Sequence, residues 1–522
     1  MAEAAVKERR RSRRSGGRSD RGAGRGGAAI EQLPWGVPHN SDAPIEPMAE
    51  EQVQAVHRAA MHILKEIGIW FLHEDAKKIL ADAGADVDPN SDRVRMDEDF
   101  VMAHVAKAPS EFTITPRNPE RQVRIGGSNM VFGNVSSPPN SSNLDRGRRA
   151  GTREDFRDLM KLSQYFNCIH LMGGYPVEPV DIHASVRHLD CISDKLTLTD
   201  KVMHAYCLGK ERVEDAMEMV RIGNGLTHEE FDATPRMYTN INSSSPLKHD
   251  WPMLDGAMRM VRRGQPVIVT PFTLSGAMAP VTIAGAVAQQ TAEALAAIVL
   301  LQIVNPGNPV VMGSFTSNVD MKSGAPAFGT PEYMRATQMS GQMARFYGLP
   351  LRATNACAAN CPDAQAAWES SHSLWAVATA RANVVYHAAG WLEGGLCASY
   401  EKFVMDCETL QQVISYMKPV SVSEEDLAVD AIEEVGPEGH FFGVQHTQDR
   451  YQTAFYSPFI SDWRNFESWE EAGSVQTPER ANKLWKQILN EFEAPPLDEG
   501  IREELDAFVA RRKEEGGAPT DF

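Results

Sequence analysis

Two matching runs, PVIVTPF (266–272) and PVVMGSF (309–315), decide the fold. Each begins with proline, continues through β-branched or other apolar residues, and ends on phenylalanine. Short apolar runs without alternating polar residues are typical of strands buried on both faces of a parallel sheet. The long apolar run between them, 282–303, predicts the crossover helix that parallel strands need.

The same strand and helix unit repeats on both sides of this pair. The candidate strands are 130–135, 168–173, 201–208, 236–242, 266–272, 309–315, 351–355 and 383–388. The candidate helices are 152–165, 182–195, 212–222, 252–261, 282–303, 331–347, 363–380 and 407–416. Eight such units predict an α/β fold, a (β/α)8 TIM barrel. The alternative is an open doubly wound sheet, but no GxGxxG motif follows the first strand.

Sequence periodicity divides the chain into four segments. We expect a disordered basic tail and linker at 1–44, an N-terminal helical segment at 45–128, the TIM barrel at 129–418, and a C-terminal helical extension at 419–522. The N-terminal helices are predicted at 49–67, 74–83 and 97–107, as a cap on the barrel. The C-terminal helices are predicted at 424–435, 479–491 and 498–513.

The charge is unevenly distributed. The formal net charge is −18, yet residues 1–29 hold nine Arg or Lys against three acidic residues, so the remainder carries about −24. An acidic body argues against nucleic acid as a partner, because phosphate binding needs clustered cations. Weak RNA binding by the Arg-rich tail is the alternative to a solvated tail.

Cysteine content and hydropathy favour a cytoplasmic protein. Seven scattered cysteines suit reduced thiols, and no apolar segment typical of a secretory signal follows the basic start. The apolar run 281–304 contains Gln289, Gln290 and Glu293, so we expect a buried barrel helix and no membrane association. Cys357 and Cys361 lack further ligands at zinc-site spacing, so we expect no metal.

Aromatic residues follow several of the candidate strands. In a TIM barrel the site lies where strands end, and these ends carry Tyr175, Phe272, Phe315 and Trp391 with amides and hydroxyls. Aromatic faces attract a quaternary ammonium, so the loops suit a small cation. The alternative is that these rings fill the barrel mouth. GxSxG, Walker and HExxH motifs are absent, and His440 and His446 are more typical of loop histidines than of ligands.

Several segments together resemble the trimethylamine methyltransferase family. They are SSPL (244–247), PFTLSGA (271–277), PDAQA (362–366), AAGWLE (388–393), GHF (439–441) and HT (446–447). The resemblance extends over about residues 40–515. It implies a TIM-barrel methyltransferase that passes a methyl group from a methylamine to the cobalt of a separate corrinoid protein.

The founding members of that family carry pyrrolysine, which we place by analogy in the loop 355–363, where this chain has only ordinary residues. The chain therefore resembles the non-pyrrolysine glycine betaine methyltransferases. A quaternary amine that loses a methyl group becomes a neutral tertiary amine, which leaves without needing a proton. A quaternary amine is therefore the expected donor, and trimethylamine is less expected. No cofactor is expected to be covalently bound; cobalamin would be supplied by the partner protein. A homo-oligomer is also expected.

From the loop ends and the resemblance we predict two groups of site residues. The substrate-binding group is Tyr175, Asn242, Phe272, Phe315 and Trp391, and the catalytic group is Asp363, Gln365, His387 and Glu393. Asp363 could instead cap the following helix. No arginine stands out as a clamp for a substrate carboxylate. Two other functions stay open, a different barrel enzyme such as a lyase and a non-catalytic binding subunit.

Overall fold

The computed structural model describes residues 30–520. Internal contacts divide the chain into residues 1–31 and residues 32–522, and the elements described below belong to the second unit. The tail predicted to be disordered, residues 1–29, lies outside the described residues, so that expectation stays a prediction.

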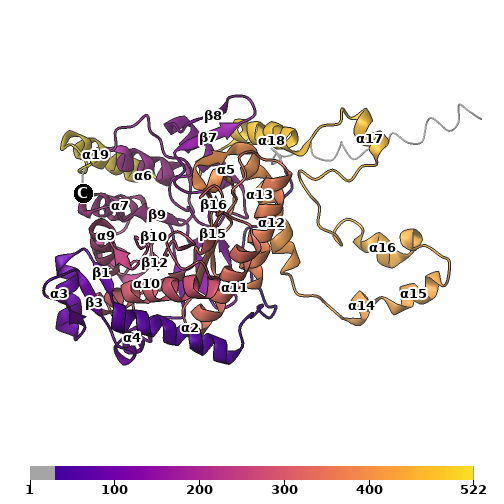
Figure 1. Ribbon diagram of the computed structural model, residues 1–522. Helices are drawn as coiled ribbons and strands as arrows, with labels where there is room; N and C mark the ends of the chain where they lie inside the picture. The colour runs from indigo at the N-terminus through magenta and orange to yellow at the C-terminus, as the bar shows by residue number, and fades with distance from the viewer. Residues whose placement is uncertain (1–29, 521–522) are drawn as a thin grey trace, which may run out of the picture. The chain divides into compact units, whose positions relative to one another are not determined.

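Seven parallel strands form the central sheet, in the order β6-β18-β17-β14-β12-β10-β9. Figure 1 labels β9, β10 and β12 of this sheet. Their bounds are β6 (Val131–Phe132), β9 (Met203–Tyr206), β10 (Met237–Ile241), β12 (Val267–Val269), β14 (Val310–Gly313), β17 (Leu351–Thr354) and β18 (Val384–Tyr386). Each coincides with a predicted strand but is shorter, because the predicted runs include the first residues of the loops.

The eighth position closes the barrel through one residue. Leu171 forms parallel bridges with Gly133 on one side and Val202 on the other, and the Met172 N–H donates to the Val202 carbonyl at 2.9 Å. The segment 168–173 therefore takes its predicted place without forming a regular strand. A Cβ atom on Gly173 would lie 2.6 Å from the Asn134 carbonyl oxygen, so the backbones approach too closely there for any residue but glycine.

Helices follow the strands and cover the outside of the barrel (Figure 1). Their bounds are α5 (Arg153–Tyr165), α6 (Arg187–Leu198), α7 (Lys210–Gly223), α8 (His228–Ala233), α9 (Trp251–Arg262), α10 (Ile283–Val304), α11 (Pro331–Phe346), α12 (Ala364–Thr379) and α13 (Tyr400–Tyr416). The chain thus has the predicted (β/α)8 TIM-barrel fold. α6 begins five residues later than predicted, because residues 182–186 form turns.

Helix α10 is the one described helix that is long and apolar enough to cross a membrane, and 89% of its most apolar window is buried inside the protein. It packs against β12 and β14 on one side and against the N-terminal helices on the other. Burial inside the protein therefore explains its composition, as the sequence predicted.

A β-hairpin fills one end of the barrel. It consists of β4 (Glu111–Ile114) and β5 (Val123–Gly126), with the 3-10 turn η2 (Pro119–Arg121) between them. Ile114, Val123 and Ile125 belong to the same buried cluster as barrel residues such as Ile268 and Val311. The end opposite the carboxyl ends of the strands is thus packed, which leaves the carboxyl end for a site.

The predicted N-terminal helices are present, and they lie along α10 rather than across the barrel end. They are α2 (Glu50–His62), continued by the π-helical turn η1 (Ile63–Ile67), α3 (Glu74–Ala83) and α4 (Glu98–Val105). A small sheet, in the order β11-β1-β3-β2, joins them to the body. Its strands are β1 (Ile69–Phe71), β2 (Asp86–Val87), β3 (Arg93–Arg95) and β11 (Lys248–His249).

Two further sheets form from the loops that follow β6, β12, β14 and β18. One has the order β13-β15-β16 and the other β19-β20-β7-β8. Their strands are β7 (Asn140–Asn143), β8 (Gly147–Ala150), β13 (Leu274–Ser275), β15 (Ser317–Val319), β16 (Pro326–Ala327), β19 (Trp391–Leu392) and β20 (Cys397–Ser399), with the turn η3 (Glu393–Gly395). They fix the loops at the carboxyl ends of the barrel strands.

The C-terminal region contains short helices followed by two long ones. The short ones are α14 (Glu424–Leu427), α15 (Val429–Val435), η4 (Phe441–Gly443), α16 (Gln445–Arg450) and α17 (Phe466–Glu471). The long helices are α18 (Thr477–Glu491), which packs on α13 and α5, and α19 (Glu499–Glu514), which packs on α6 and α7. The helices predicted at 479–491 and 498–513 therefore return to the outside of the barrel. The helix predicted at 424–435 is instead divided into α14 and α15 at Ala428, which has a φ of 52°.

Candidate active site

A pocket of about 440 Å³ opens at the carboxyl ends of the barrel strands. All eight positions of the barrel contribute to it, which is the usual location of a TIM-barrel site. Its lining residues are Ser136, Ser137, Gly173, His204, Tyr206, Cys207, Leu208, Asn240, Asn242, Met253, Phe272, Phe315, Arg352, Tyr386, His387, Trp391, Gly394 and Gly395. Four of the five predicted substrate-binding residues, and the predicted catalytic His387, are among them.

Three of the predicted aromatic residues lie together in this pocket. The ring centres of Phe272 and Phe315 are 4.8 Å apart, and those of Phe315 and Trp391 are 6.2 Å apart in an edge-to-face arrangement. They follow β12, β14 and β18. β12 and β14 are neighbours in the sheet, and only β17 separates β14 from β18. The indole Nε1 of Trp391 is buried without a hydrogen-bond partner among the described residues.

Arg352 introduces a positive charge into the pocket. It lies in β17, deeper than the aromatic residues, and is 2% exposed. Its guanidinium carbon is 4.5 Å from the ring centre of Tyr386 and 5.4 Å from that of Phe315. Burial lowers the pKa of Arg352 to about 10, so the group remains cationic at neutral pH. Its Nε is buried without a partner, and no carboxylate of the described residues forms an ion pair with it.

His387 lies beside Trp391, with ring centres 3.9 Å apart. The backbone N–H of Ser136 donates to its Nδ1 at 3.1 Å, so the proton of the neutral ring is on Nε2. Burial lowers the pKa of His387 well below 6.5, and the nearby charge of Arg352 adds to this effect. His387 also has a φ of 53°, a strained conformation for a residue other than glycine. The neutral ring therefore presents an N–H donor from a fixed position.

Polar side chains on β10 and directly after it are held in fixed orientations. The Asn242 amide donates to the Thr270 carbonyl at 2.8 Å, and the Asn240 amide donates to Asn242 Oδ1 at 3.2 Å. Thr270 Oγ1 in turn donates to Asn240 Oδ1 at 2.7 Å. The pocket wall here is neutral and preorganised.

Cys207 is the pocket's thiol. Burial raises its pKa to about 12, so it is protonated at neutral pH and is a poor nucleophile. Burial also lowers the pKa of His204 well below 6.5. The pocket is thus equipped to bind and orient a small molecule, with no activated protein nucleophile among its lining residues.

The other predicted residues lie outside this pocket. Asp363 is exposed and caps α12, accepting from the Ala366 N–H at 3.1 Å, which is the alternative considered for it. Gln365 donates to Glu369 at 2.8 Å, and both Glu393 oxygens accept from Arg148 Nε at 2.9 Å. These contacts give the three residues local structural roles, because each polar group is engaged with the protein itself.

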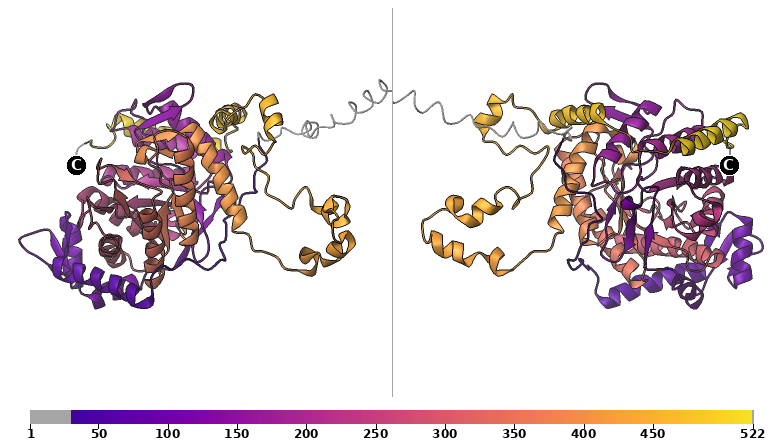
Figure 2. Two further views of the ribbon diagram at one scale, coloured as in Figure 1. Left: turned by 45° about the vertical axis from the view of Figure 1, so that its right-hand side comes forward. Right: turned by 180° about the vertical axis from the view of Figure 1, so that it is seen from behind.

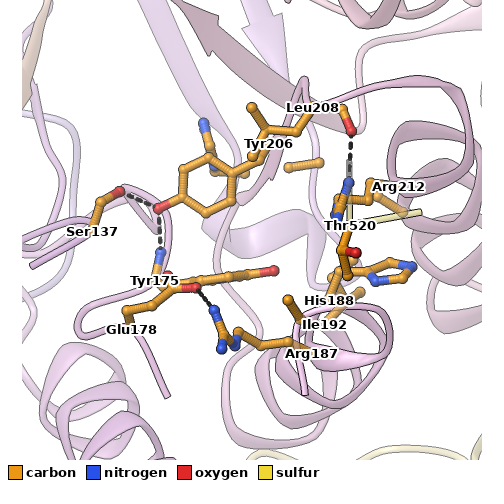
Figure 3. A pocket seen from close by; sticks show the side chains of 14 residues that line it. Ser137, Tyr175, Glu178, Arg187, His188, Ile192, Tyr206, Leu208, Arg212 and Thr520 are labelled. Atoms are coloured by element: carbon orange, nitrogen blue, oxygen red, sulfur yellow. Dashed lines mark hydrogen bonds and ion pairs between the residues drawn. The ribbon is translucent and has the colours of Figure 1, made fainter. Parts of the chain in front are cut away.

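Tyr175 lines a second cavity, of about 340 Å³, which shares Ser137, His204, Tyr206 and Leu208 with the first (Figure 3). Tyr206 lies between the two, and its hydroxyl accepts from the Tyr175 N–H at 3.0 Å. Arg187 donates to Glu178 at 2.5 Å, and Figure 3 draws this contact as a dashed line. Tyr175 is therefore one ring removed from the pocket that holds the other aromatic residues.

Sequence reasoning missed Arg352, Tyr206 and Tyr386. No arginine stood out in the sequence as a carboxylate clamp, and the structure places Arg352 in the pocket. Arg352 interrupts the otherwise uncharged strand 351–354, and a charge in a buried strand was the available signal. Tyr206 and Tyr386 lie inside the predicted strands 201–208 and 383–388, at the ends of the observed β9 and β18, and gave no signal that distinguished them from core residues.

The fold and this pocket together define a TIM-barrel enzyme with an aromatic, singly cationic site. The sequence model of the trimethylamine methyltransferase (MTTB) family matches residues 14–517, and the chain belongs to that family. It is a methyltransferase.

Two relatives are named methyltransferases, and one solved structure shares the fold. A glycine betaine methyltransferase of Desulfitobacterium hafniense is 38% identical over 90% of this chain and 98% of its own length. A trimethylamine methyltransferase, MttB, of Desulfitobacterium hafniense is 28% identical over 90% and 94%. The crystal structure of the hydroxylamine MtmB complex matches the fold with a TM-score of 0.50 and 11% identity, covering 90% of each chain.

Proposed function

We propose that this methyltransferase takes a methyl group from a quaternary amine that carries a carboxylate, with glycine betaine as the first candidate, and passes it to Co(I) of a corrinoid protein. The observation that carries the proposal is Arg352, a buried cation without a carboxylate partner among the described residues, in an aromatic pocket. An unpaired buried charge is costly, and a substrate carboxylate would compensate it. The 38% identical relative named for glycine betaine supports the same choice.

The geometry suggests how a betaine would bind. Its carboxylate would pair with Arg352 and accept a hydrogen bond from Nε2 of His387, which the Ser136 N–H keeps protonated. Its trimethylammonium group would lie against Phe272, Phe315 and Trp391, which follow the strand ends and are nearer the barrel mouth. The methyl groups would then face the opening.

The reaction needs positioning rather than proton transfer. The C–N bond breaks with its electron pair left on nitrogen, so a neutral tertiary amine leaves. A corrinoid in the Co(I) state supplies the electron pair of the new bond to the methyl carbon. The role of this chain is to hold the C–N bond in line with the approaching acceptor. The protonated thiol of Cys207 would not compete as a methyl acceptor.

The partner and compartment complete the proposal. Cobalamin would arrive on a separate corrinoid protein at the barrel mouth. All seven cysteines are free thiols, which fits the proposed cytoplasmic location.

The test is methylation of free cob(I)alamin by the purified full-length chain, followed by absorbance. The donors are glycine betaine, carnitine, proline betaine, choline and trimethylamine. We expect turnover with one of the betaines and little with trimethylamine or with choline, which lacks the carboxylate. Arg352→Met should abolish betaine turnover, whereas Arg335→Met, on the exposed surface of α11, should not change it.

The other outcomes separate the competing functions. Trimethylamine as the better donor would overturn the quaternary-amine proposal. Betaine binding without methyl transfer, to free cobalamin or to a corrinoid protein, would indicate a non-catalytic binding subunit. A chain that binds none of these amines would indicate a different barrel chemistry, such as a lyase.

A further inference from the structure

We propose that Tyr206 sets the upper size limit of the methyl donor, because its side chain separates the active-site pocket from the second cavity. The pocket of about 440 Å³ and the cavity of about 340 Å³ share four lining residues, Ser137, His204, Tyr206 and Leu208. The inference rests on the proposed function, since it concerns how a betaine bound to Arg352 fits the pocket.

The side chain of Tyr206 is held in one position. Its hydroxyl contacts the hydroxyls of Ser136, at 3.1 Å, and Ser137, and it accepts from the Tyr175 N–H at 3.0 Å. A Cβ atom on Gly174 would lie 2.5 Å from the Tyr206 hydroxyl oxygen, so the backbone of that loop is packed directly against the hydroxyl. Two loops therefore fix the ring, which makes it a wall of the pocket rather than a movable gate.

Tyr206 stands opposite Arg352 across the barrel. Tyr206 is the last residue of β9, and Arg352 lies in β17. β14, β12 and β10 separate these two strands on one side, and the segment 168–173, β6 and β18 separate them on the other. In the proposed binding mode the carboxylate of the donor is at Arg352, and its nitrogen is at the aromatic residues of the mouth. The carbon between these two groups would therefore face Tyr206.

The second cavity, on the far side of Tyr206, has the size and lining for an apolar side chain. Small-molecule sites occupy about 300–1,000 Å³, so a cavity of about 340 Å³ has room for a single aromatic ring. The apolar and aromatic residues of its lining include Tyr175, Ile192, Ala205, Leu208 and Ala216. Its charged residues Glu178 and Arg187 pair with each other. The ring of Tyr206 is thus what keeps a bulky substituent of the donor out of this space.

Residues after α19 form part of the outer wall of the second cavity. The right-hand view of Figure 2 shows α19, in yellow, on the outside of the barrel, where it packs on α6 and α7. Beyond α19, the Ala518 N–H donates to the Ser185 carbonyl at 2.8 Å. Arg212 donates to the Pro519 carbonyl at 2.7 Å, and Thr520 lines the cavity. A substituent admitted past Tyr206 would lie against this wall, where burial of its apolar surface favours binding.

The test compares glycine betaine with phenylalanine betaine, which has the same carboxylate and trimethylammonium groups and a benzyl group on the carbon between them. Both enantiomers are titrated by calorimetry, because only one of them directs the benzyl group toward Tyr206. Wild type should bind glycine betaine at least about 100-fold more tightly than either enantiomer. Tyr206→Ala removes the wall and should bind one enantiomer within about 10-fold of glycine betaine. Tyr206→Phe keeps the ring and should exclude both enantiomers, as wild type does.

A second substitution tests where the benzyl group lies. Ala184 lines the second cavity but not the active-site pocket. Tyr206→Ala combined with Ala184→Phe should therefore refill the cavity, lose the gained binding of phenylalanine betaine and still bind glycine betaine. Circular dichroism shows whether each variant is folded. Tyr206→Leu, a smaller change, replaces Tyr206→Ala if that variant is unfolded.

Three results would overturn the inference while the proposed function stands, because glycine betaine still binds in each of them. They are wild type that binds phenylalanine betaine as tightly as glycine betaine, a folded Tyr206→Ala protein without the gain, and a gain that survives Ala184→Phe. Wild type that binds neither donor would overturn the proposed function and this inference with it.

Discussion

The guanidinium carbon of Arg352 lies 4.5 Å from the ring centre of Tyr386, on the neighbouring strand β18. The ring face stabilises the buried cation and fixes its direction within the barrel. Tyr386→Leu should therefore weaken binding of glycine betaine about 2- to 30-fold, or about 0.5–2 kcal/mol. Tyr386→Phe keeps the face and should bind nearly as well as wild type. Calorimetric titration measures both, and equal losses in the two variants would contradict this role of the ring.

The aromatic residues at the mouth should recognise charge. Trp391→Leu or Phe272→Leu removes a ring face while keeping the wall apolar, so binding of glycine betaine should weaken by about 0.5–2 kcal/mol. The neutral isostere 3,3-dimethylbutyrate has a tert-butyl group in place of trimethylammonium and should lose less. Competition binding of the two ligands to each variant gives the comparison. Equal losses for both ligands would mean that the rings only fill space.

Lys195 should make stability depend on pH. It is fully buried, and burial lowers its pKa to about 7, whereas an unfolded lysine has a pKa of about 10.4. Between these values the unfolded chain binds a proton that the folded chain does not, so the free energy of unfolding rises with pH. The slope from Lys195 is about 1.4 kcal/mol per pH unit between these two pKa values. Below about pH 7 the residue contributes no slope, because it is protonated in both the folded and the unfolded chain.

Lys195→Met should remove this contribution. Urea unfolding of wild type and variant at pH 7, 8 and 9 measures the difference between the two slopes. Lys201, whose pKa burial also lowers to about 7, remains in both proteins, so its contribution cancels. Parallel slopes for wild type and variant would show that Lys195 does not titrate in this range.

Glu293 should stabilise the loop after β10. This fully buried carboxylate accepts from Ser243, from Ser245 at 2.6 Å and from the Leu247 N–H at 2.8 Å. Glu293→Gln replaces one of the two carboxylate oxygens by an NH2 group. That group cannot accept a hydrogen bond from the hydroxyls or the backbone N–H that donate to the carboxylate. Hydrogen bonds to charged groups contribute about 1.5–3 kcal/mol, so we expect a loss of stability of about that size in urea unfolding. The exposed Glu332→Gln on α11 is the control and should change little.

The strand order explains why part of the site could be predicted. Phe272, Phe315 and Trp391 each follow a predicted strand, and the carboxyl ends of parallel strands meet at one end of a barrel. Asp363 also lies near the end of a predicted strand, but the loop after β17 carries it to the exposed start of α12. The position of Asp363 in the sequence predicted that it lies near the carboxyl end of the barrel. It did not predict the direction in which the side chain points.

The amino-acid sequence by itself determined the repeat of strands and helices, the family, and the aromatic character of the barrel mouth, because each depends on local pattern. Only the tertiary structure decided that Arg352 has no carboxylate partner among the described residues and faces Tyr386, and that the Ser136 N–H fixes the proton of His387 on Nε2. Ser136 and His387 are 251 residues apart. Such relationships depend on barrel closure, which places distant residues within hydrogen-bond distance and sets how far each is removed from water.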